Sequence, residues 1–209
     1  MKTVQHLIVI VVSFLLVVSA FTARALAQNA ETKSLILSLN KGGYVIVLRH
    51  GDTNHDQNDI LPPDYNDITK QRRLSEKGRQ TARQIGGAVK KLGIVFDKVE
   101  TSKLDRGVET GTLVVSGEVI PTMDLTESNA SVTPDEKERR ATALRVKVGV
   151  MPAPGQDTLL VTHKPNIVDA FGKTLEDIGE GESVVFKPDG SGKADLIGRI
   201  KETDWRSVE

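Results

Sequence analysis

The chain has 209 residues, no cysteine and a formal net charge of +0, and only 4% of its residues are aromatic. The lack of cysteine excludes the small disulfide-dense scaffolds of secreted proteins and an N-terminal lipid attached through cysteine. The balanced charge and the few aromatic side chains argue against a nucleic-acid partner, because such proteins present basic surfaces and stacking platforms. The length fits a single domain with a sizeable core behind a short leader.

Residues 1–27 have the pattern of a secretory signal peptide. Lys2 supplies a positive start, residues 7–21 are almost wholly apolar, and a small-x-small cleavage pattern ends at Ala27. The apolar stretch is short for a membrane-spanning helix, which needs about 20 residues. We therefore expect a mature domain of residues 28–209, periplasmic or secreted, without stable membrane insertion. An uncleaved N-terminal membrane anchor is the alternative.

The first elements of the mature chain lead to a pair of basic residues. Residues 31–39 form a short amphipathic segment, and the apolar run at 44–48 predicts a buried strand that ends at Arg49 and His50. A polar, turn-rich stretch follows over 54–73. Loops of this length are commonly functional, so we expect this one to cover the site.

Helices and strands alternate through the middle of the chain. Apolar residues at 82, 85, 89 and 92 follow spacings of 3, 4 and 3, which is one face of a helix. Ser75 suits its N-cap and Gly93 its C-cap. In chain order we predict a helix between Ser75 and Gly93, a strand over 96–101, a helix over 103–116 with Ser102 as N-cap and Asp105 at N3, a strand near 123–125, and a helix over 135–148 with Pro134 at N1.

The C-terminal third repeats the arrangement of a strand that ends at a histidine. Residues 158–162 form a second apolar, β-branched run that ends at His163, and a helix follows from Pro165. Residues 184–186 and 196–198 flank a Pro-Asp-Gly-Ser-Gly turn and predict a hairpin. The whole order predicts an α/β fold, a three-layer α/β/α sandwich with a mostly parallel central sheet and a C-terminal β-hairpin.

Four basic or imidazole side chains are expected at one edge of this sheet. His50 and His163 both follow strands, and ligands of open α/β sheets bind at the carboxyl ends of the strands. Arg49 and Arg106 would add two planar guanidiniums, which grip phosphate oxygens in pairs. Taken singly, each of these residues also has a structural explanation, such as a core hydrogen bond or a surface ion pair.

Four separated motifs resemble the signatures of the histidine phosphatase superfamily, the phosphoglycerate-mutase-like group (branch 1). They are residues 48–53 (LRHGDT), 74–82 (LSEKGRQTA), 102–110 (SKLDRGVET) and 161–166 (VTHKPN). The tripeptide R-H-G alone recurs by chance, whereas four motifs in the order of the family are specific. The resemblance extends over most of residues 28–209, which it identifies as a histidine phosphatase domain.

The resemblance implies that His50 attacks phosphorus and forms a phosphohistidine, while Arg49, Arg106 and His163 complete the phosphate pocket. General chemistry agrees, because a neutral imidazole with a pKa of about 6.5 is nucleophilic near neutral pH. The two arginines and a protonated His163 would stabilise the transferring phosphoryl group. No metal and no other cofactor is implied, since side chains supply the cations.

The leaving group of a phosphomonoester needs a proton, and two carboxyl groups are candidates for its donor. Glu127, just after the expected strand near 123–125, is the leading candidate, and Asp52 is the second. The nucleophile's own motif supplies candidate substrate-binding residues in Asp52, Thr53 and Asn54.

Three positions depart from the pattern of the family. Asp56 lies near where many members carry a phosphate-binding asparagine, and Asn54 or Asn58 could take that part. Gly107 and Gly111 stand where alanine is usual, at a cost of about 1 kcal/mol each in helix propensity. Closer packing of the helix against the sheet is the expected compensation.

These observations predict a phosphomonoesterase whose partner is a small phosphorylated metabolite or an envelope sugar phosphate. A phosphohistidine protein phosphatase and a non-catalytic phosphate-binding module are the alternatives. A mutase is disfavoured, because the glycolytic substrate is cytosolic and the leader indicates export. Nothing in the sequence indicates an oligomeric state.

Overall fold

The computed structural model describes residues 26–129 and 131–208. The predicted signal peptide therefore lies outside the described residues except at Leu26 and Ala27, and it stays a prediction. Residues 26–38 form a helix, and the 3-10 turn η1 (Leu39–Lys41) continues it. Among the described helices, none combines the length and the apolar character needed to cross a bilayer.

Strands and helices alternate along the rest of the chain. The α-helices and strands are, in order, β1 (Val45–Arg49), α2 (Glu76–Leu92), β2 (Phe96–Ser102), α3 (Asp105–Val115), β3 (Ile120–Thr122), α4 (Pro134–Val148), β4 (Asp157–Thr162), α5 (Lys164–Phe171), β5 (Ser183–Pro188) and β6 (Ala194–Ile200). Short 3-10 turns lie between them: η2 (Ile68–Lys70), η3 (Met123–Leu125), η4 (Lys173–Leu175) and η5 (Asp204–Val208).

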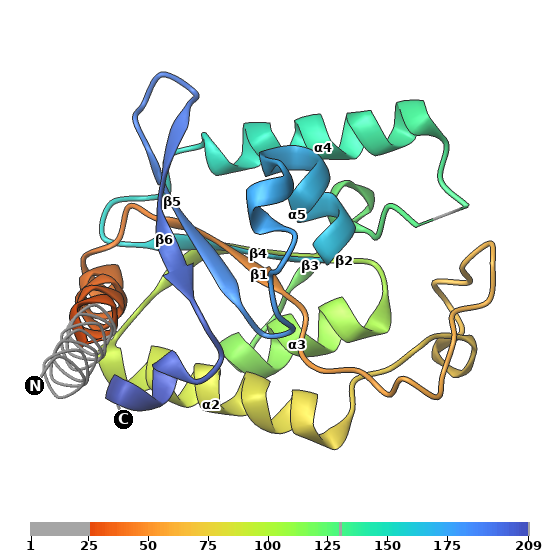
Figure 1. Ribbon diagram of the computed structural model, residues 1–209, viewed down its shortest axis with the longest axis horizontal. Helices are drawn as coiled ribbons and strands as arrows, with labels where there is room; N and C mark the ends of the chain where they lie inside the picture. The colour runs from red at the N-terminus through yellow and green to blue at the C-terminus, as the bar shows by residue number, and fades with distance from the viewer. Residues whose placement is uncertain (1–25, 130, 209) are drawn as a thin grey trace, which may run out of the picture.

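The six strands form one sheet in the order β3-β2-β4-β1-β5-β6. The first four are parallel to one another, β5 is antiparallel to β1, and β6 returns along β5 as a hairpin. Helices α2 and α3 cover one face of the sheet, and α4 and α5 cover the other (Figure 1). This confirms the predicted three-layer sandwich, its mostly parallel sheet and its C-terminal hairpin.

Each face of the sheet has its own hydrophobic core, and β1 contributes to both. Ile46 and Leu48 pack into the core beneath α2 and α3, whereas Val45 and Val47 pack into the core beneath α4 and α5. This division follows from the two-residue repeat of a strand, which sends successive side chains to opposite faces. A strand buried on both faces has a continuous apolar sequence, as residues 44–48 do.

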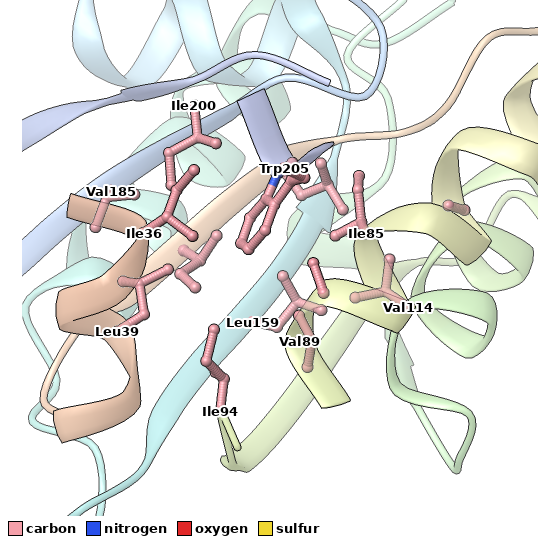
Figure 2. Close-up of a cluster of buried hydrophobic side chains, with 14 of the residues drawn as sticks. Ile36, Leu39, Ile85, Val89, Ile94, Val114, Leu159, Val185, Ile200 and Trp205 are labelled. Carbon is pink, nitrogen blue, oxygen red and sulfur yellow. The ribbon is translucent and has the colours of Figure 1, made fainter. Parts of the chain in front are cut away.

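The two ends of the described chain meet in the core beneath α2. Trp205 of η5 is 1% exposed and lies in the same cluster as Ile36 and Leu39 near the N-terminus. Figure 2 shows these side chains around Leu159 of the central strand β4. The C-terminal turn therefore closes one end of the core as an integral part of the domain.

Local signals in the sequence set the ends of several helices correctly. The Ser75 hydroxyl accepts a hydrogen bond from the Gly78 N–H at 3.0 Å, and Gly93 ends α2 in the left-handed conformation with φ 68°. Pro134 lies in the first turn of α4, behind Thr133 as the N-cap. These predictions are confirmed. The sequence could predict the caps because the partners of each cap lie within one turn of the chain.

Two predictions about local structure are wrong. Ser102 is the last residue of β2 and not the N-cap of α3, which begins at Asp105 behind Leu104. The Ser102 hydroxyl instead accepts a hydrogen bond from the Leu104 N–H at 3.0 Å and bonds to His163. The strand expected near residues 123–125 is the 3-10 turn η3, and the strand β3 precedes it.

The two glycines of α3 permit the close approach to β2 that the sequence predicted. A Cβ atom on Gly107 would lie 2.8 Å from the Cβ of Ser102, and one on Gly111 would lie 2.7 Å from Cγ2 of Thr101. Side chains at these positions would push the helix away from the strand. Since Arg106 precedes Gly107, this spacing also sets where Arg106 stands.

Gly78 marks an equally close approach, between α2 and the turn after β1. A Cβ on Gly78 would overlap the backbone of Asp52, so we expect Gly78→Ala to destabilise the protein by about 2–3 kcal/mol or more. Gly87 lies in the same helix with open space around its Cα, and Gly87→Ala should stabilise by up to about 1 kcal/mol. Urea denaturation of both variants tests the pair. Equal effects of the two changes would contradict the close contact at Gly78.

Asp157 is a buried carboxylate that should make stability depend on pH. Its Oδ1 accepts the Tyr44 N–H at 2.9 Å, its Oδ2 has no hydrogen-bond partner in the described structure, and burial raises its pKa from 3.8 to about 6. The folded protein thus holds this proton more tightly than the unfolded chain. The resulting stability is present below about pH 4 and is lost as the pH rises through about 6.

We expect Asp157→Asn to flatten this pH profile and to raise the free energy of unfolding at neutral pH. The rise of the pKa to about 6 corresponds to at most roughly 3 kcal/mol. Urea denaturation across this pH range measures the effect, and Asp195→Asn, on the surface, controls for loss of charge. An unchanged profile in Asp157→Asn would show that Asp157 does not carry the dependence.

Candidate active site

The parallel pairing of β1 with β4 brings the two strand-end histidines together. Arg49 is in register with Thr162, so His50 and His163 directly follow the ends of two adjacent strands. The His50 N–H donates to the Thr162 carbonyl at 3.1 Å. The two imidazole centroids lie 5.0 Å apart, and the two residues are 2% and 0% exposed.

His50 is held as a neutral imidazole with one defined tautomer. Its Nδ1 lies 2.8 Å from the carbonyl oxygen of Gly51, and because a carbonyl can only accept, Nδ1 carries the proton. Nε2 therefore keeps its lone pair. Burial and the charge of Arg106 hold the pKa of His50 well below 6.5. The Gly51 N–H donates to the Thr110 hydroxyl at 3.1 Å, which fixes the turn after the histidine.

His163 lies beside both Ser102 and Glu127. Its Nε2 is 2.7 Å from the Ser102 hydroxyl, and its Nδ1 is 4.0 Å from Oε1 of Glu127 without a hydrogen-bond partner in the described residues. Burial, then Arg106, then His50 hold the pKa of His163 well below 6.5. These causes favour the neutral imidazole, whereas the role expected from the sequence, support of a bound phosphoryl group, requires the protonated form.

Arg106 is fully buried at the start of α3 and has three oxygen partners. Its Nη1 donates to Oδ1 of Asp59 at 3.0 Å and to the carbonyl of Arg72 at 3.2 Å, and its Nη2 donates to Oε2 of Glu127 at 2.9 Å. Buried cations need such partners, because an isolated buried charge is costly. The Arg106 guanidinium thereby joins α3 to the loop over 54–73 and to the turn that carries Glu127.

Arg49 points its guanidinium at the segment that leads into β5. Nη1 donates to the Ile178 carbonyl at 2.7 Å, and Nη2 lies 3.3 Å from Oε1 of Glu180. The Thr53 hydroxyl donates to the same Glu180 oxygen at 3.2 Å. Arg49 and Thr53 thus meet at one carboxylate, which sequence reasoning did not single out.

Glu127 is fixed through its backbone by two buried polar side chains. Asn166 donates to the Thr126 carbonyl at 2.9 Å and accepts the Ser128 N–H at 3.1 Å. Arg140, 4% exposed, donates to the carbonyls of Thr126 and Glu127 at 2.9 and 3.0 Å. The carboxylate proposed as proton donor therefore sits on a rigid turn between Arg106 and His163.

Asp52 and Asn54, two candidate substrate-binding residues in or beside the motif over 48–53, contact other parts of the chain. Asp52 accepts a hydrogen bond from the Ser75 hydroxyl and lies 3.6 Å from the Lys77 ammonium, so it holds the start of α2. The side-chain oxygen of Asn54 accepts a hydrogen bond from the Asp56 N–H. Asn54, Asp56 and Asn58 are all exposed.

Four residues that the sequence did not single out as site residues contact the predicted ones. They are Asp59, Arg72, Ser102 and Glu180. Ser102 belongs to a recognised motif, and the loop predicted to cover the site contains Asp59 and Arg72, so weak signals existed. Glu180 lies in an irregular segment with no such signal.

One group of side chains near this edge has the composition of a metal site. Asp52, His55 and Glu180 offer ligand atoms that all lie within 4.8 Å of one another. Glu180 is already engaged by Arg49 and Thr53. The contacts with Arg49 and Thr53 therefore explain the position of the Glu180 carboxylate without a metal ion.

The model of the histidine phosphatase superfamily (branch 1) matches residues 45–145 of the chain. This range contains Arg49, His50, Arg106 and Glu127, and it ends before His163. The match supports a place for the chain in this superfamily.

Two solved phosphatase structures have the same fold. A protein histidine phosphatase, SixA, solved with tungstate, is 18% identical with a TM-score of 0.52, and the match covers 77% of this chain and 98% of that one. A phosphoserine phosphatase from Entamoeba histolytica, in complex with 3-phosphoglyceric acid, is 14% identical with a TM-score of 0.56, covering 78% and 98%. At these identities the likeness shows the shared fold.

We expect an anion in the pocket to reverse the protonation of His163. A phosphate dianion beside the ring favours the imidazolium, so inorganic phosphate should raise the pKa of His163 from its low value in the free protein. NMR titration of the histidine rings, with and without phosphate, measures the shift. Chloride at equal ionic strength is the control, and an unchanged His163 pKa at saturating phosphate would contradict the expected role.

Proposed function

We propose that the chain is a phosphatase that hydrolyses a phosphomonoester through a phosphohistidine on His50. The observation that carries the proposal is the hydrogen bond from Nδ1 of His50 to the Gly51 carbonyl, which leaves Nε2 unprotonated in a pocket with Arg106 and His163. A neutral, oriented imidazole among buried cations suits attack on a phosphoryl group.

The reaction proceeds in two displacements at phosphorus. Nε2 of His50 forms a bond to phosphorus as the bond to the ester oxygen breaks, and the alcohol leaves with a proton. Water then attacks the phosphohistidine, phosphate leaves, and Nε2 regains its lone pair. Arg49, Arg106 and His163 stabilise the charge on the transferring oxygens in both steps.

Glu127 is the proposed donor of the leaving-group proton. Its carboxyl lies 2.9 Å from Arg106 and 4.0 Å from His163, within the group of side chains that would surround the phosphoryl. The second candidate, Asp52, is engaged by Ser75 and Lys77 at the start of α2. In the second step the Glu127 carboxylate would take a proton from the attacking water.

For the substrate, we propose a small phosphorylated metabolite or an envelope sugar phosphate, and we propose that the protein is exported. The apolar leader in residues 7–21 and the small-x-small pattern that ends at Ala27 support export. Phosphohistidine in a protein is the alternative substrate, and its nitrogen leaving group would lessen the need for Glu127.

Turnover in metal-free buffer tests the proposal. We expect hydrolysis of p-nitrophenyl phosphate by the wild-type protein and its loss in His50→Ala, with acid-labile phosphate trapped only on the wild type. Glu127→Gln should slow an alkyl phosphate by about 10²–10⁴-fold. It should slow p-nitrophenyl phosphate much less, because p-nitrophenolate leaves without a proton.

Three outcomes would each contradict one part of the proposal. Unchanged activity in His50→Ala would remove the nucleophile. Phosphate binding without hydrolysis of any phosphomonoester or phosphohistidine peptide would identify a phosphate-binding module. Equal slowing of both esters in Glu127→Gln would exclude Glu127 as the proton donor.

A further inference from the structure

A third arginine, Arg72, lies on the loop over 54–73 and contacts Arg106 through its backbone. Its backbone is fixed directly against Arg106: the Arg72 N–H donates to Oδ1 of Asp59 at 2.9 Å, and its carbonyl accepts from Nη1 of Arg106 at 3.2 Å. The same Asp59 oxygen also accepts from Arg106 at 3.0 Å. These bonds hold Arg72 in place independently of its side chain.

The Arg72 side chain differs from the other two guanidiniums in having no ionic partner. Arg49 lies 3.3 Å from Glu180, and Arg106 contacts two carboxylates. Within residues 26–129 and 131–208, no carboxylate oxygen lies within 4.0 Å of the Arg72 guanidinium. Its buried Nε has no hydrogen-bond partner there, and the same is true of Nε in Arg49, Arg73 and Arg106, so the missing carboxylate is what sets Arg72 apart.

The charge of Arg72 acts on the groups that would handle phosphate. Burial and Arg106 are the main causes that lower the pKa of His50 and of His163, and Arg72 lowers both further. Burial is the largest cause that lowers the pKa of Arg49, and the charge of Arg72 is the second cause that lowers it. The guanidinium is therefore close enough to act on groups from β1 and from the end of β4.

We propose that Arg72 is a third anion-binding residue of the pocket and that it contacts an oxygen of the bound phosphoryl group, a role that rests on the proposed function of this site. Arg49 and Arg106 already face carboxylates, so an incoming dianion must share those guanidiniums. Arg72 offers its N–H groups without such competition. A planar fork with free donors suits phosphate oxygens.

Arg73 provides a matched control on the same loop. It has the same charge and the next position in the chain, but its Nε lies 3.7 Å from Asp105, and it is not among the groups that shift the pKa of His50 or His163. Arg72→Gln and Arg73→Gln therefore remove equal charge from adjacent positions. Arg72→Lys keeps the charge without the planar fork.

Titration calorimetry with inorganic phosphate tests the proposal without requiring turnover. We expect Arg72→Gln to weaken phosphate binding by about 10–100-fold, the value of one charge-assisted hydrogen bond. Arg73→Gln should bind within about twofold of wild type, since Arg73 contacts Asn54, Gln57 and Asp105 and none of the residues proposed to bind phosphate. Arg72→Lys should recover part of the loss.

A second readout separates an electrostatic role from a merely structural one. Without phosphate, the NMR pKa values of His50 and His163 should rise in Arg72→Gln and stay unchanged in Arg73→Gln. Wild-type phosphate affinity in Arg72→Gln, with an unchanged thermal unfolding midpoint, would overturn the proposal.

The same binding data distinguish this proposal from the proposed function. Phosphate binding that depends on Arg72, in a protein that hydrolyses no ester, would contradict the phosphatase and leave Arg72 as an anion-binding residue. If the wild type binds no phosphate, both proposals fail. If Arg72→Gln is unstable, equal affinities of wild type and Arg72→Lys would argue against the planar fork as a ligand.

Discussion

The buried guanidinium of Arg106 is the interaction on which the geometry of the site depends. A cation with no exposed surface must be neutralised and hydrogen-bonded where it lies. Asp59 and Glu127 provide the charge, and the Arg72 carbonyl provides a further acceptor. Asp59 and Arg72 belong to the loop over 54–73 and Glu127 to the turn after η3, so one side chain fixes both segments relative to the first turn of α3.

The sheet supplies the second constraint, because parallel pairing of β1 with β4 leaves no freedom in where the two imidazoles meet. A shift of one residue in that register would turn the apolar side chains of β1 to the wrong cores and would separate His50 from His163. The hydrophobic pattern that buries Val45–Leu48 on both faces therefore also sets the distance between the rings. Stability and the placement of the reactive groups come from the same residues.

The sequence was sufficient for features whose partners are near in the chain or whose pattern is periodic. Ser75 caps α2 through an N–H three residues away, and the apolar runs before His50 and His163 read directly as buried strands. Ser102 was misassigned because pairing with β3 extends β2 through this residue, and its hydroxyl also contacts an imidazole 61 residues away; neither partner is near it in the chain. Glu180 was not predicted for the same reason. Its partner Arg49 is far away in sequence, and the path of the loop that carries Glu180 depends on tertiary packing.

The shared burial of Ile36 and Trp205 has a consequence for how the domain can be attached to anything else. Both ends of the described chain pack over the core beneath α2, on the left of Figure 1, while the loop over 54–73 extends on the right. Both ends of the described chain thus lie at the end of the domain opposite the loop over 54–73. Trp205 is also the single tryptophan, so intrinsic fluorescence monitors the integrity of this terminal junction and not events among the imidazoles.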